Sequence, residues 1–355
     1  MKNIKILGGG PAGLSAAINL AKAGYEVDVF ERNKDAGHRF LGDLQGLENW
    51  SEKIDVLERF RKMNIIINFD CDPFTDYAFY NGYRVWKLSE KAPSFYAVKR
   101  GGIKGSLDQG LKKQSLEVGV KIHFGSTIPE TKADIIATGP IQKELLAADK
   151  GVTFKTKMED VAIMLFNNKA AYNGYGYLLV TKGYGCLCTV VDIKSRNVRE
   201  SLEETKRLFS NIVDLDIKNP HNVGGTGCFS NQNIFQKENR LYVGESAGLQ
   251  DFFWGFGIGL AITSGFLAAK SIIENKNYEK LAKAKFRNKM KAGVSNRFFW
   301  ENFNFRNYTL IMNWLFKSNT IPKMHSLYNF NHPLQRLSYP IALYYMRKQS
   351  PHLRL

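Results

Sequence analysis

Apolar runs and a glycine-rich turn alternate in the first thirty residues. Residues 3–7 form a short apolar run that leads directly into the glycines within residues 8–13. Residues 14–23 then place alanine and leucine at helical spacing, and residues 25–30 form a second apolar run. The pattern predicts a strand, a tight turn, a helix and a second strand, which is the order of a βαβ unit.

Short strands and helices alternate less regularly after residue 48. Runs rich in β-branched and aromatic residues predict strands at 65–69, 77–80, 83–88, 95–98, 120–124 and 134–139, and a further run of strands across 161–193. Apolar residues at helical spacing predict helices at 50–63, 104–117 and 200–212. Residues 241–248 are typical of a strand that enters a turn.

The segment 252–269 is long and apolar enough to imitate a membrane span. Four glycines interrupt it, and it follows a strand-like segment. A helix that begins at Gly257 can present free N–H groups to a ligand, which explains the mixture of apolar residues and glycines. We therefore interpret the segment as a buried helix that begins at a ligand site.

Gly8, Gly10 and Gly13 form a G-x-G-x-x-G motif directly after the first strand. In a dinucleotide-binding unit the first glycine permits the tight turn, the second lets the backbone approach a pyrophosphate, and the third allows close helix packing. The helix N-terminus around Ala12 then faces the diphosphate. Glu31 ends the second strand, where a carboxylate accepts hydrogen bonds from a ribose and disfavours the 2′-phosphate of NADP.

Three later features accompany this motif. Arg100 precedes a predicted helix, an Ala-Thr-Gly strand ends at Gly139, and Gly-Glu-Ser-Ala-Gly begins at Gly244, ahead of Gly-Phe-Gly-Ile. In this order, across residues 1–275, the motifs resemble the geranylgeranyl reductase family within the p-hydroxybenzoate hydroxylase-type flavoprotein fold. The resemblance implies FAD as the cofactor and flavin-dependent oxidoreductase chemistry.

The resemblance also implies roles for single residues. It puts Arg100 beside the FAD and Gly257 and Ile258 near the flavin ring. Glu245 takes the place where the family usually has an aspartate on the ribityl chain, so one extra methylene must be accommodated. For Arg39 we weigh a contact with the cofactor equally against a plain surface position. The expected cofactor-binding residues are Gly8, Gly10, Ala12, Gly13, Glu31, Arg32, Arg39, Arg100, Gly139, Gly244, Glu245, Gly257 and Ile258.

Three reactions fit such a flavoprotein. A reductase passes a hydride from reduced flavin to a carbon–carbon double bond of an apolar, isoprenoid-type lipid. A monooxygenase hydroxylates its substrate, and a lycopene cyclase-like enzyme uses reduced flavin without net redox change. Aromatic hydroxylases of this fold commonly continue the late motif as Gly-Asp-Ala-Ala-His, whereas Gly248 stands here as in the reductases, so the resemblance favours a reductase.

Substrate contacts are less specific in the sequence. Tyr175 and Tyr177 are the nearest match to the family's Tyr-x-Trp-x-Phe-Pro stretch that lines the substrate cavity, and ordinary strand aromatics are the alternative. No catalytic residue is assigned. No second glycine motif is visible, so we expect an external electron donor, either NAD(P)H or a protein. The four cysteines lack a paired metal-binding spacing, so no metal is expected.

These observations predict an α/β protein with a Rossmann-type FAD-binding domain, an inserted β-rich substrate domain and a helical C-terminal region. The predicted boundaries are 1–48, 95–150 and 230–275 for the FAD-binding domain, 49–94 and 151–229 for the substrate domain, and 276–355 for the C-terminal region. Because the first strand begins by Asn3 with no signal segment ahead of it, we expect a cytoplasmic protein.

Charge is concentrated in the C-terminal region. The chain has a net charge of +17, and residues 276–355 hold fifteen Lys or Arg, two acidic residues and fifteen Phe, Tyr or Trp. Such a mixture favours an anionic membrane surface, with 298–300 and 308–316 docking beside the basic run 280–291. The alternative is that the aromatics pack onto the FAD-binding domain and the lysines form a solvated face. No recognisable nucleic-acid module accompanies the charge, so nucleic acid is not an expected partner.

Overall fold

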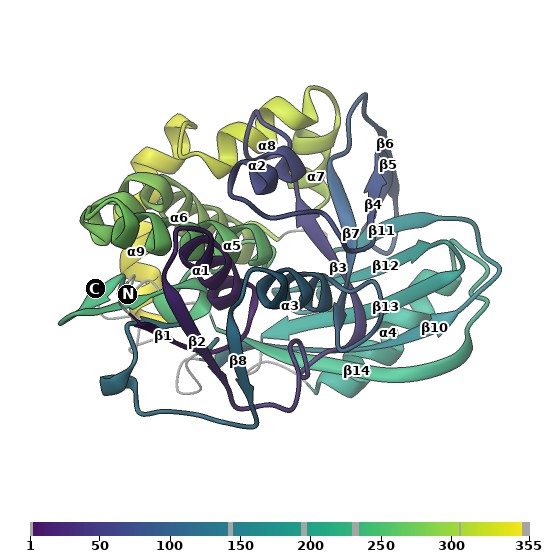
Figure 1. Cartoon of the computed structure of the whole chain (residues 1–355). Helices are drawn as coiled ribbons and strands as arrows, with labels where there is room; N and C mark the ends of the chain where they lie inside the picture. The colour runs from purple at the N-terminus through teal and green to yellow at the C-terminus, as the bar shows by residue number, and fades with distance from the viewer. Residues whose placement is uncertain (1–2, 141–144, 193–196, 229–233, 305–306, 350–355) are drawn as a thin grey trace.

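In the part of the chain that the structure describes, the fold consists of three β-sheets and a set of C-terminal helices (Figure 1). The computed structural model describes residues 3–140, 145–192, 197–228, 234–304 and 307–349. The predicted class, an α/β fold with a Rossmann-type unit, a β-rich part and a helical C-terminal region, is confirmed.

A six-stranded sheet has the order β15-β16-β9-β1-β2-β8. Five of its strands pair in parallel, and β15 joins β16 antiparallel at one edge. Its strands come from three separate stretches of the chain, so the dinucleotide unit closes only when distant segments meet. The bounds are β1 (Asn3–Leu7), β2 (Glu26–Glu31), β8 (Lys121–Phe124), β9 (Ile135–Ile136), β15 (Gln236–Lys237) and β16 (Arg240–Tyr242).

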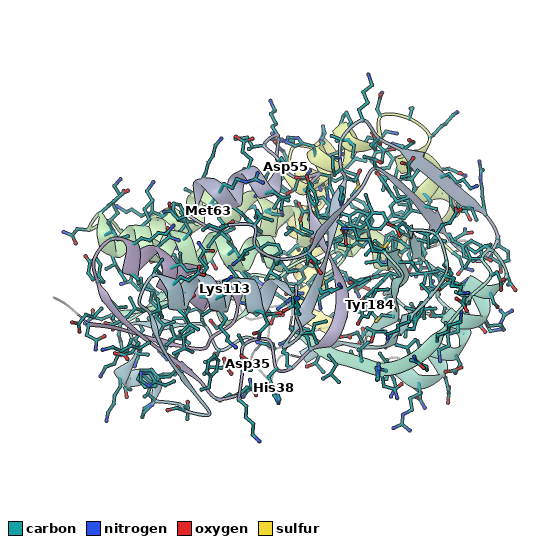
Figure 2. All side chains as sticks on the ribbon, turned by 45° about the vertical axis from the view of Figure 1, so that its right-hand side comes forward. Asp35, His38, Asp55, Met63, Lys113 and Tyr184 are labelled. Carbon is teal, nitrogen blue, oxygen red and sulfur yellow. The ribbon has the colours of Figure 1, made fainter. Side chains whose placement is uncertain are left out.

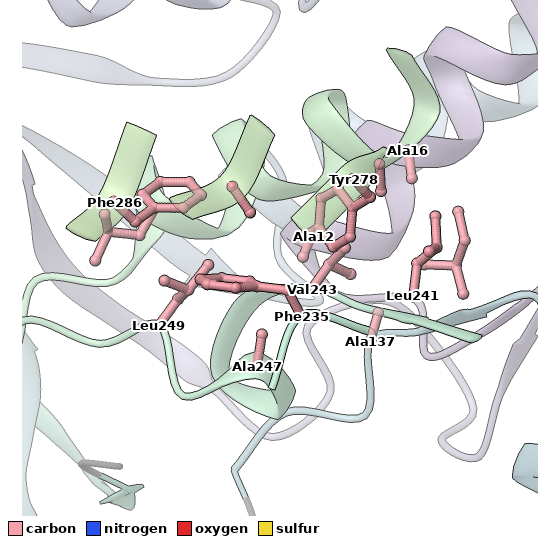
Figure 3. Packing of buried hydrophobic residues seen from close by; sticks show 14 of the residues in the cluster. Ala12, Ala16, Ala137, Phe235, Leu241, Val243, Ala247, Leu249, Tyr278 and Phe286 are labelled. Carbon is pink, nitrogen blue, oxygen red and sulfur yellow. The ribbon is translucent and has the colours of Figure 1, made fainter. Parts of the chain in front are cut away.

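Two helices pack directly against each other on this sheet, α1 (Pro11–Lys22) and α5 (Ile258–Ile273). The Ser15 hydroxyl donates to the Ile262 carbonyl at 2.8 Å. A Cβ on Gly265 would lie 2.0 Å from the Ala12 carbonyl oxygen, so the two backbones are in contact there. Side chains from α1, the sheet and the next helix, α6 (Tyr278–Asn302), fill the core around them (Figure 3).

A seven-stranded sheet forms the β-rich part, in the order β14-β10-β13-β12-β11-β5-β6. It is antiparallel apart from the pairing of β11 with β5. Its strands are β5 (Asp76–Tyr80), β6 (Val85–Ser89), β10 (Leu145–Lys155), β11 (Val161–Leu165), β12 (Tyr175–Thr181), β13 (Tyr184–Asp192) and β14 (Lys218–Cys228). Helix α4 (Val198–Ser210) packs on it through Leu202, Leu208 and Phe209.

A third, three-stranded sheet lies between these two parts, with β7 (Phe95–Gly101) between β3 (Leu41–Glu48) and β4 (Cys71–Phe74). Helix α3 (Leu107–Glu117) follows β7, and the short turns η1 (Glu130–Lys132) and η3 (Gly244–Ala247) precede β9 and follow β16. The predicted domain boundaries remain predictions. Within them, helix α2 (Val56–Lys62) shares a core with α1 and α3, whereas β5 and β6 join the seven-stranded sheet.

Several predicted elements differ from the structure, and the strand expected at 134–139 covers only Ile135–Ile136. Residues 65–69 form no strand, and Ile65 and Phe69 instead pack into the core beside α1 and α3. The helix expected at 50–63 begins at Val56, because the Asp55 side chain accepts a hydrogen bond from the Leu57 backbone N–H at 2.8 Å and caps the first turn. Ile65, Phe69 and Phe60 are buried, as the apolar pattern predicts, but Ile66 and Ile54 are 55% and 43% exposed. The pattern therefore predicted neither the backbone conformation nor every exposed position.

The C-terminal helices are α6, α7 (Thr309–Phe316), α8 (Thr320–Tyr328) and α9 (Pro333–Gln349). Trp300, Tyr308 and Phe316 are 2%, 0% and 7% exposed and belong to the aromatic core beside the seven-stranded sheet. The expectation that 298–300 and 308–316 dock on a membrane therefore fails for these side chains, which pack inward. Within the described residues, no helix is both long and apolar enough to cross a membrane.

Candidate cofactor and substrate site

A cavity of about 890 Å³ lies where the six-stranded sheet, the seven-stranded sheet and the C-terminal helices meet. This volume is near the upper end of the range of about 300–1,000 Å³ for small-molecule sites. All of the predicted site residues except Gly13 line it. They are Gly8, Gly10, Ala12, Glu31, Arg32, Arg39, Arg100, Gly139, Tyr175, Tyr177, Gly244, Glu245, Gly257 and Ile258.

The three motif glycines are required for different reasons. Gly8 has φ of +109°, and a Cβ there would lie 2.2 Å from the Ala137 carbonyl oxygen. A Cβ on Gly13 would lie 2.1 Å from the Gly8 carbonyl oxygen, which explains why Gly13 packs the helix and does not line the cavity. A Cβ on Gly10 would meet no atom within 4 Å. Space is therefore left at the one motif glycine that is expected to approach a pyrophosphate.

Two helix N-termini open onto this cavity. The N-cap residues Gly10 of α1 and Gly257 of α5 make no side-chain cap hydrogen bond, and neither helix has an acidic residue in its first turn. The first N–H groups of a helix have no partner within the helix, and the helix dipole favours negative charge there. The chain therefore leaves two sets of donors for a ligand, as a flavin dinucleotide requires.

Glu31 is buried at the end of β2, and both of its carboxylate oxygens accept hydrogen bonds from the protein. Oε2 accepts from the Gly9 backbone N–H at 2.8 Å, and Oε1 accepts from the backbone and side-chain nitrogens of Asn33 at 2.9 and 2.6 Å. A carboxylate has about four acceptor positions, so capacity remains for a ribose hydroxyl. These bonds fix the carboxylate at the wall of the cavity.

Arg100 is held by residues that the sequence did not single out. Its guanidinium makes a two-point salt bridge with Asp108, with Nε–Oδ2 and Nη2–Oδ1 distances of 2.8 and 3.0 Å, and Nη1 donates to Gln45 Oε1 at 2.9 Å. The ring of Phe40 contacts the guanidinium groups of both Arg100 and Arg39, at 4.3 and 4.6 Å. Two positive charges therefore lie beside the cavity in fixed positions.

Arg39 is directed toward Glu245. Its Nη1 lies 3.7 Å from Glu245 Oε2, and a Cβ on Gly139 would lie 3.9 Å from both side chains. Burial raises the pKa of the Glu245 carboxyl above its usual value, although Arg39 and Arg100 act against this shift. The structure thus brings together three predicted residues, Arg39, Gly139 and Glu245, that are at least 100 positions apart in the chain.

The loop before α5 is fixed by its own polar side chains. The Gln250 amide donates to the Gly255 carbonyl at 2.7 Å. The Asp251 carboxylate accepts from the Trp254 backbone N–H at 2.9 Å and from the Tyr328 hydroxyl at 3.1 Å. Burial raises the pKa of Asp251 to about 6. The loop that leads to Gly257 and Ile258 is therefore anchored to α8.

One face of the seven-stranded sheet forms another wall of the cavity. Four residues pair in a row across four neighbouring strands. Tyr175 on β12 pairs with Val190 on β13, Val190 pairs with Asp149 on β10, and Asp149 pairs with Gly225 on β14. Paired residues point to the same face of a sheet, and all four line the cavity. A Cβ on Gly255 would lie 3.2 Å from the Tyr175 hydroxyl, so this row reaches the loop before α5.

Asp149 is the acidic group in this row, and sequence analysis missed it. Its burial and the nearby carboxylate of Asp43 raise the pKa of Asp149 to about 6. Burial also raises the pKa of the Tyr175 hydroxyl, which therefore stays protonated near neutral pH. The row thus presents a carboxyl with a pKa of about 6 and a hydroxyl group that stays protonated.

A further part of the wall is apolar. Phe79 and Phe316 stack with ring centroids 3.9 Å apart, and Phe166 and Trp254 stack at 5.6 Å. Met324 of α8 lines the same space. Among the described residues, the buried indole N–H of Trp254 has no hydrogen-bond partner, so one donor is left in an otherwise apolar wall.

His38 lines the cavity from the loop between β2 and β3, where Figure 2 also labels Asp35. Asp35 accepts a hydrogen bond from the Lys112 ammonium at 2.7 Å. Nothing in this geometry assigns His38 a chemical role. Within the described residues, no group of three His, Cys, Asp or Glu side chains could hold a metal ion.

Comparison with known proteins agrees with this geometry. The family model of NAD(P)-binding Rossmann-like domains matches residues 6–42. No curated protein matches the chain in sequence. Among solved structures, a geranylgeranyl bacteriochlorophyll reductase-like protein from Thermoplasma acidophilum is 17% identical, with a TM-score of 0.66 over 99% of this chain and 97% of that one.

Two other similar structures are enzymes of different kinds. A flavin-dependent brominase is 14% identical, with a TM-score of 0.66 over 98% of this chain and all of that one. A 2-methyl-3-hydroxypyridine-5-carboxylic acid oxygenase is 15% identical, with a TM-score of 0.57 over 92% and 95%. This chain has the fold of flavin-dependent enzymes. The likeness agrees with the FAD expected from the sequence. Proteins with different reactions share this fold, so the fold alone does not identify the reaction.

Proposed function

We propose that this protein binds FAD and reduces carbon–carbon double bonds of an apolar, isoprenoid-type lipid. The observation that carries the proposal is a single cavity with two kinds of wall. One contains Gly8 and Gly10 of the glycine motif, Glu31 and two open helix N-termini, and the other contains stacked aromatic side chains. A ligand site that joins fixed polar groups to an apolar surface suits a cofactor and an apolar substrate side by side.

The residues present fit FAD. The N–H groups at the start of α1, around Ala12, would bind the diphosphate, Glu31 the adenosine ribose and Glu245 the ribityl chain. The N-terminus of α5, at Gly257 and Ile258, would hold the flavin ring. Bound FAD would supply the hydride, once an external donor, NAD(P)H or a protein, had reduced it.

The chain's own residues would orient the lipid, exclude water and deliver the proton. The aromatic wall provides an apolar surface for the lipid and keeps water from the reacting carbons. We assign the proton that completes the reduction to the carboxyl of Asp149, because it faces the cavity and has a pKa of about 6. The Tyr175 hydroxyl, in the same row, would position the substrate against the loop before α5.

The test uses purified protein whose bound cofactor is first identified by mass spectrometry. Chemically reduced protein is then mixed with geranylgeraniol without oxygen, while the flavin absorbance and the product mass are followed. The proposal expects flavin reoxidation together with a product that has gained two hydrogen atoms. In a parallel reaction with oxygen, formation of a hydroxylated product would establish the monooxygenase alternative. A rearranged product of unchanged mass would establish a cyclase-like reaction.

A further inference from the structure

Helix α9 carries four large apolar side chains on an exposed face. Leu334, Leu337, Ile341 and Tyr344 are 58%, 76%, 62% and 69% exposed. Their spacing of three, four and three residues places them in one stripe along the helix. A surface helix normally presents polar residues to water at these positions, so the stripe requires an explanation.

The opposite face of α9 is firmly packed. Gln335, Ala342 and Met346 are 1%, 0% and 5% exposed. The Ser295 hydroxyl donates to the Gln335 carbonyl at 3.1 Å, and the Gln335 amide donates to the Leu327 carbonyl at 2.7 Å. The helix is therefore held in place by one face while the apolar stripe stays outside the core.

The exposed apolar surface extends to α7. Leu310 and Trp314, one helical turn apart, are 63% and 46% exposed. The Trp314 ring lies 5.9 Å from the ring of His332, which directly precedes α9, and the Lys323 ammonium lies 5.4 Å from the Trp314 ring centroid. The two exposed segments are therefore joined at the start of α9.

The charged residues of the C-terminal segment indicate which kind of partner this surface binds. No acidic residue occurs from Asn302 to Leu355, whereas seven Lys or Arg do. In α6, by contrast, Lys285 and Lys289 already pair with acidic partners, at 2.7 and 3.0 Å. A basic segment with no acidic residues of its own repels a second copy of itself, and an anionic lipid surface attracts it.

We propose that the exposed face of α9, with Leu310 and Trp314 of α7, docks on an anionic lipid membrane. Leucine and isoleucine enter the acyl boundary, Tyr344 and Trp314 lie at the interface, and the basic side chains contact the lipid phosphates. Helix α7 also lines the cavity through Phe316, so one helix connects the docking surface with the apolar wall. The docking does not depend on the proposed function, and its test uses no enzymatic activity.

The first experiment is flotation of the full chain with vesicles of phosphatidylcholine alone or mixed with phosphatidylglycerol. The wild type should float with the anionic vesicles, and binding should fall as salt is raised. Leu337→Gln/Ile341→Gln/Tyr344→Gln should lower the partition roughly tenfold or more. The matched control is Ile66→Gln/Tyr83→Gln/Leu116→Gln, which removes side chains that are 55%, 81% and 49% exposed elsewhere and should float as the wild type does.

A charge series tests the electrostatic part. Arg336→Gln/Arg347→Gln/Lys348→Gln should weaken flotation with anionic vesicles, whereas Lys53→Gln/Lys91→Gln/Lys237→Gln, with the same charge change at exposed sites, should not. Equal flotation with neutral and anionic vesicles, or with neither, would overturn the proposal. The proposal would also be overturned if light scattering showed that the wild type is a dimer and that Leu337→Gln/Ile341→Gln/Tyr344→Gln is a monomer. The exposed face of α9 would then bind a second copy of the chain.

A spectroscopic readout covers the case in which a triple variant folds poorly. The other four tryptophans, Trp50, Trp86, Trp254 and Trp300, are all under 9% exposed, so Trp314 is the residue open to lipid. Vesicles with brominated acyl chains should quench part of the wild-type fluorescence, and Trp314→Phe should abolish that part. Quenching that persists unchanged in Trp314→Phe would contradict the docking orientation.

Discussion

The carboxylate of Glu31 offers the sharpest single-residue test of the cofactor site. Glu31→Gln keeps the size of the side chain but replaces one carboxylate oxygen with an NH2 group. This group is a donor, and it would face the backbone N–H of Gly9 or Asn33, which is also a donor. Loss of a charged hydrogen bond costs about 1.5–3 kcal/mol, so the Kd for FAD should rise about 10- to 100-fold. Flavin fluorescence titration measures this, with Glu26→Gln at the exposed start of β2 as the control. Unchanged affinity would remove Glu31 from the site.

The proton assigned to Asp149 predicts a pH profile. Because its folded pKa is raised to about 6, the carboxyl is fully protonated well below pH 6 and loses the proton as pH rises through 6. Single-turnover reduction should therefore slow about tenfold per pH unit above 6, and Asp149→Asn should be slow with no such dependence. A profile that Asp149→Asn leaves intact would identify another donor.

The raised pKa of Asp149 also affects stability. The free energy of unfolding should fall as pH rises from 3.8 to about 6, since the folded state binds this proton more tightly than the unfolded chain does.

The buried pair between Arg100 and Asp108 predicts a stability effect. Their side chains are 8% and 2% exposed, so Asp108→Asn leaves a buried guanidinium with only part of its partners. Removing one member of such a pair costs about 3–5 kcal/mol. Denaturant unfolding should show this loss, whereas Glu58→Gln, in an exposed pair with Lys62, should change stability by about 1 kcal/mol or less. A loss no larger than that of the control would mean that the pair is not stabilising.

Local pattern decided which site residues could be predicted from sequence. Gly8, Gly10 and Glu31 follow one another within a single βαβ unit, so their spacing alone indicates their roles. Asp108 and Asp149 could not be found in this way. Asp149 reaches the cavity only because β10 pairs with β13 in a register that aligns it with Tyr175, and no short motif encodes that alignment.

At the scale of elements, the contact of α1 with α5 predicts a mutation that acts on two helices at once. A Cβ in Gly265→Ala would lie 2.0 Å from the Ala12 carbonyl oxygen, so the helices must separate. We expect a loss of about 1–3 kcal/mol in stability together with weaker FAD binding, measured by thermal unfolding and flavin titration. The control is Gly259→Ala on α5, where a Cβ would meet nothing within 4 Å and the gain in helix propensity should stabilise slightly. If both variants behave alike, the close contact is not what holds the helices.

Elements whose conformation depends on a partner were the ones that sequence analysis missed. Strand β14 contains proline, asparagine and glycine, which disfavour strands, yet it pairs along the length of β10. A Cβ on Gly224 would lie 2.7 Å from the Asp149 carbonyl oxygen, so the glycine permits the close approach. Residues 65–69 show the reverse, because Ile65 is buried there without a strand partner, although Ile66 is 55% exposed.

At the scale of the whole molecule, FAD should act as a structural component, because its expected contacts come from both α1 and α5 and from two sheets. FAD at 100 times its Kd should add about 2.7 kcal/mol to the free energy of unfolding, which is a rise of a few degrees in Tm for a chain of this size. Differential scanning calorimetry with and without added FAD measures it. AMP at the same molar concentration as FAD serves as a control for filling part of the site, and a Tm that FAD leaves unchanged would contradict the assignment.

Composition alone could not decide where the C-terminal aromatics lie. The count of aromatic and basic residues was compatible with both packing and membrane docking, and only the tertiary structure separates Trp300 and Tyr308, which are buried, from Trp314 and Tyr344, which are not. Helical spacing of apolar residues occurs on two faces of α9, and the sequence does not say which face meets the core.

The contact between α1 and α5 also has a consequence for the timing of synthesis. Ser15 leaves the ribosome early, but its partner Ile262 follows 247 residues later, and at roughly 5–20 residues per second the wait is about 12–50 s. During that interval the glycine motif is present while the second half of the cofactor site does not yet exist. Nascent chains that stop before α5 should therefore emerge without flavin, and acquisition of the yellow cofactor would mark the moment at which α1 and α5 first meet.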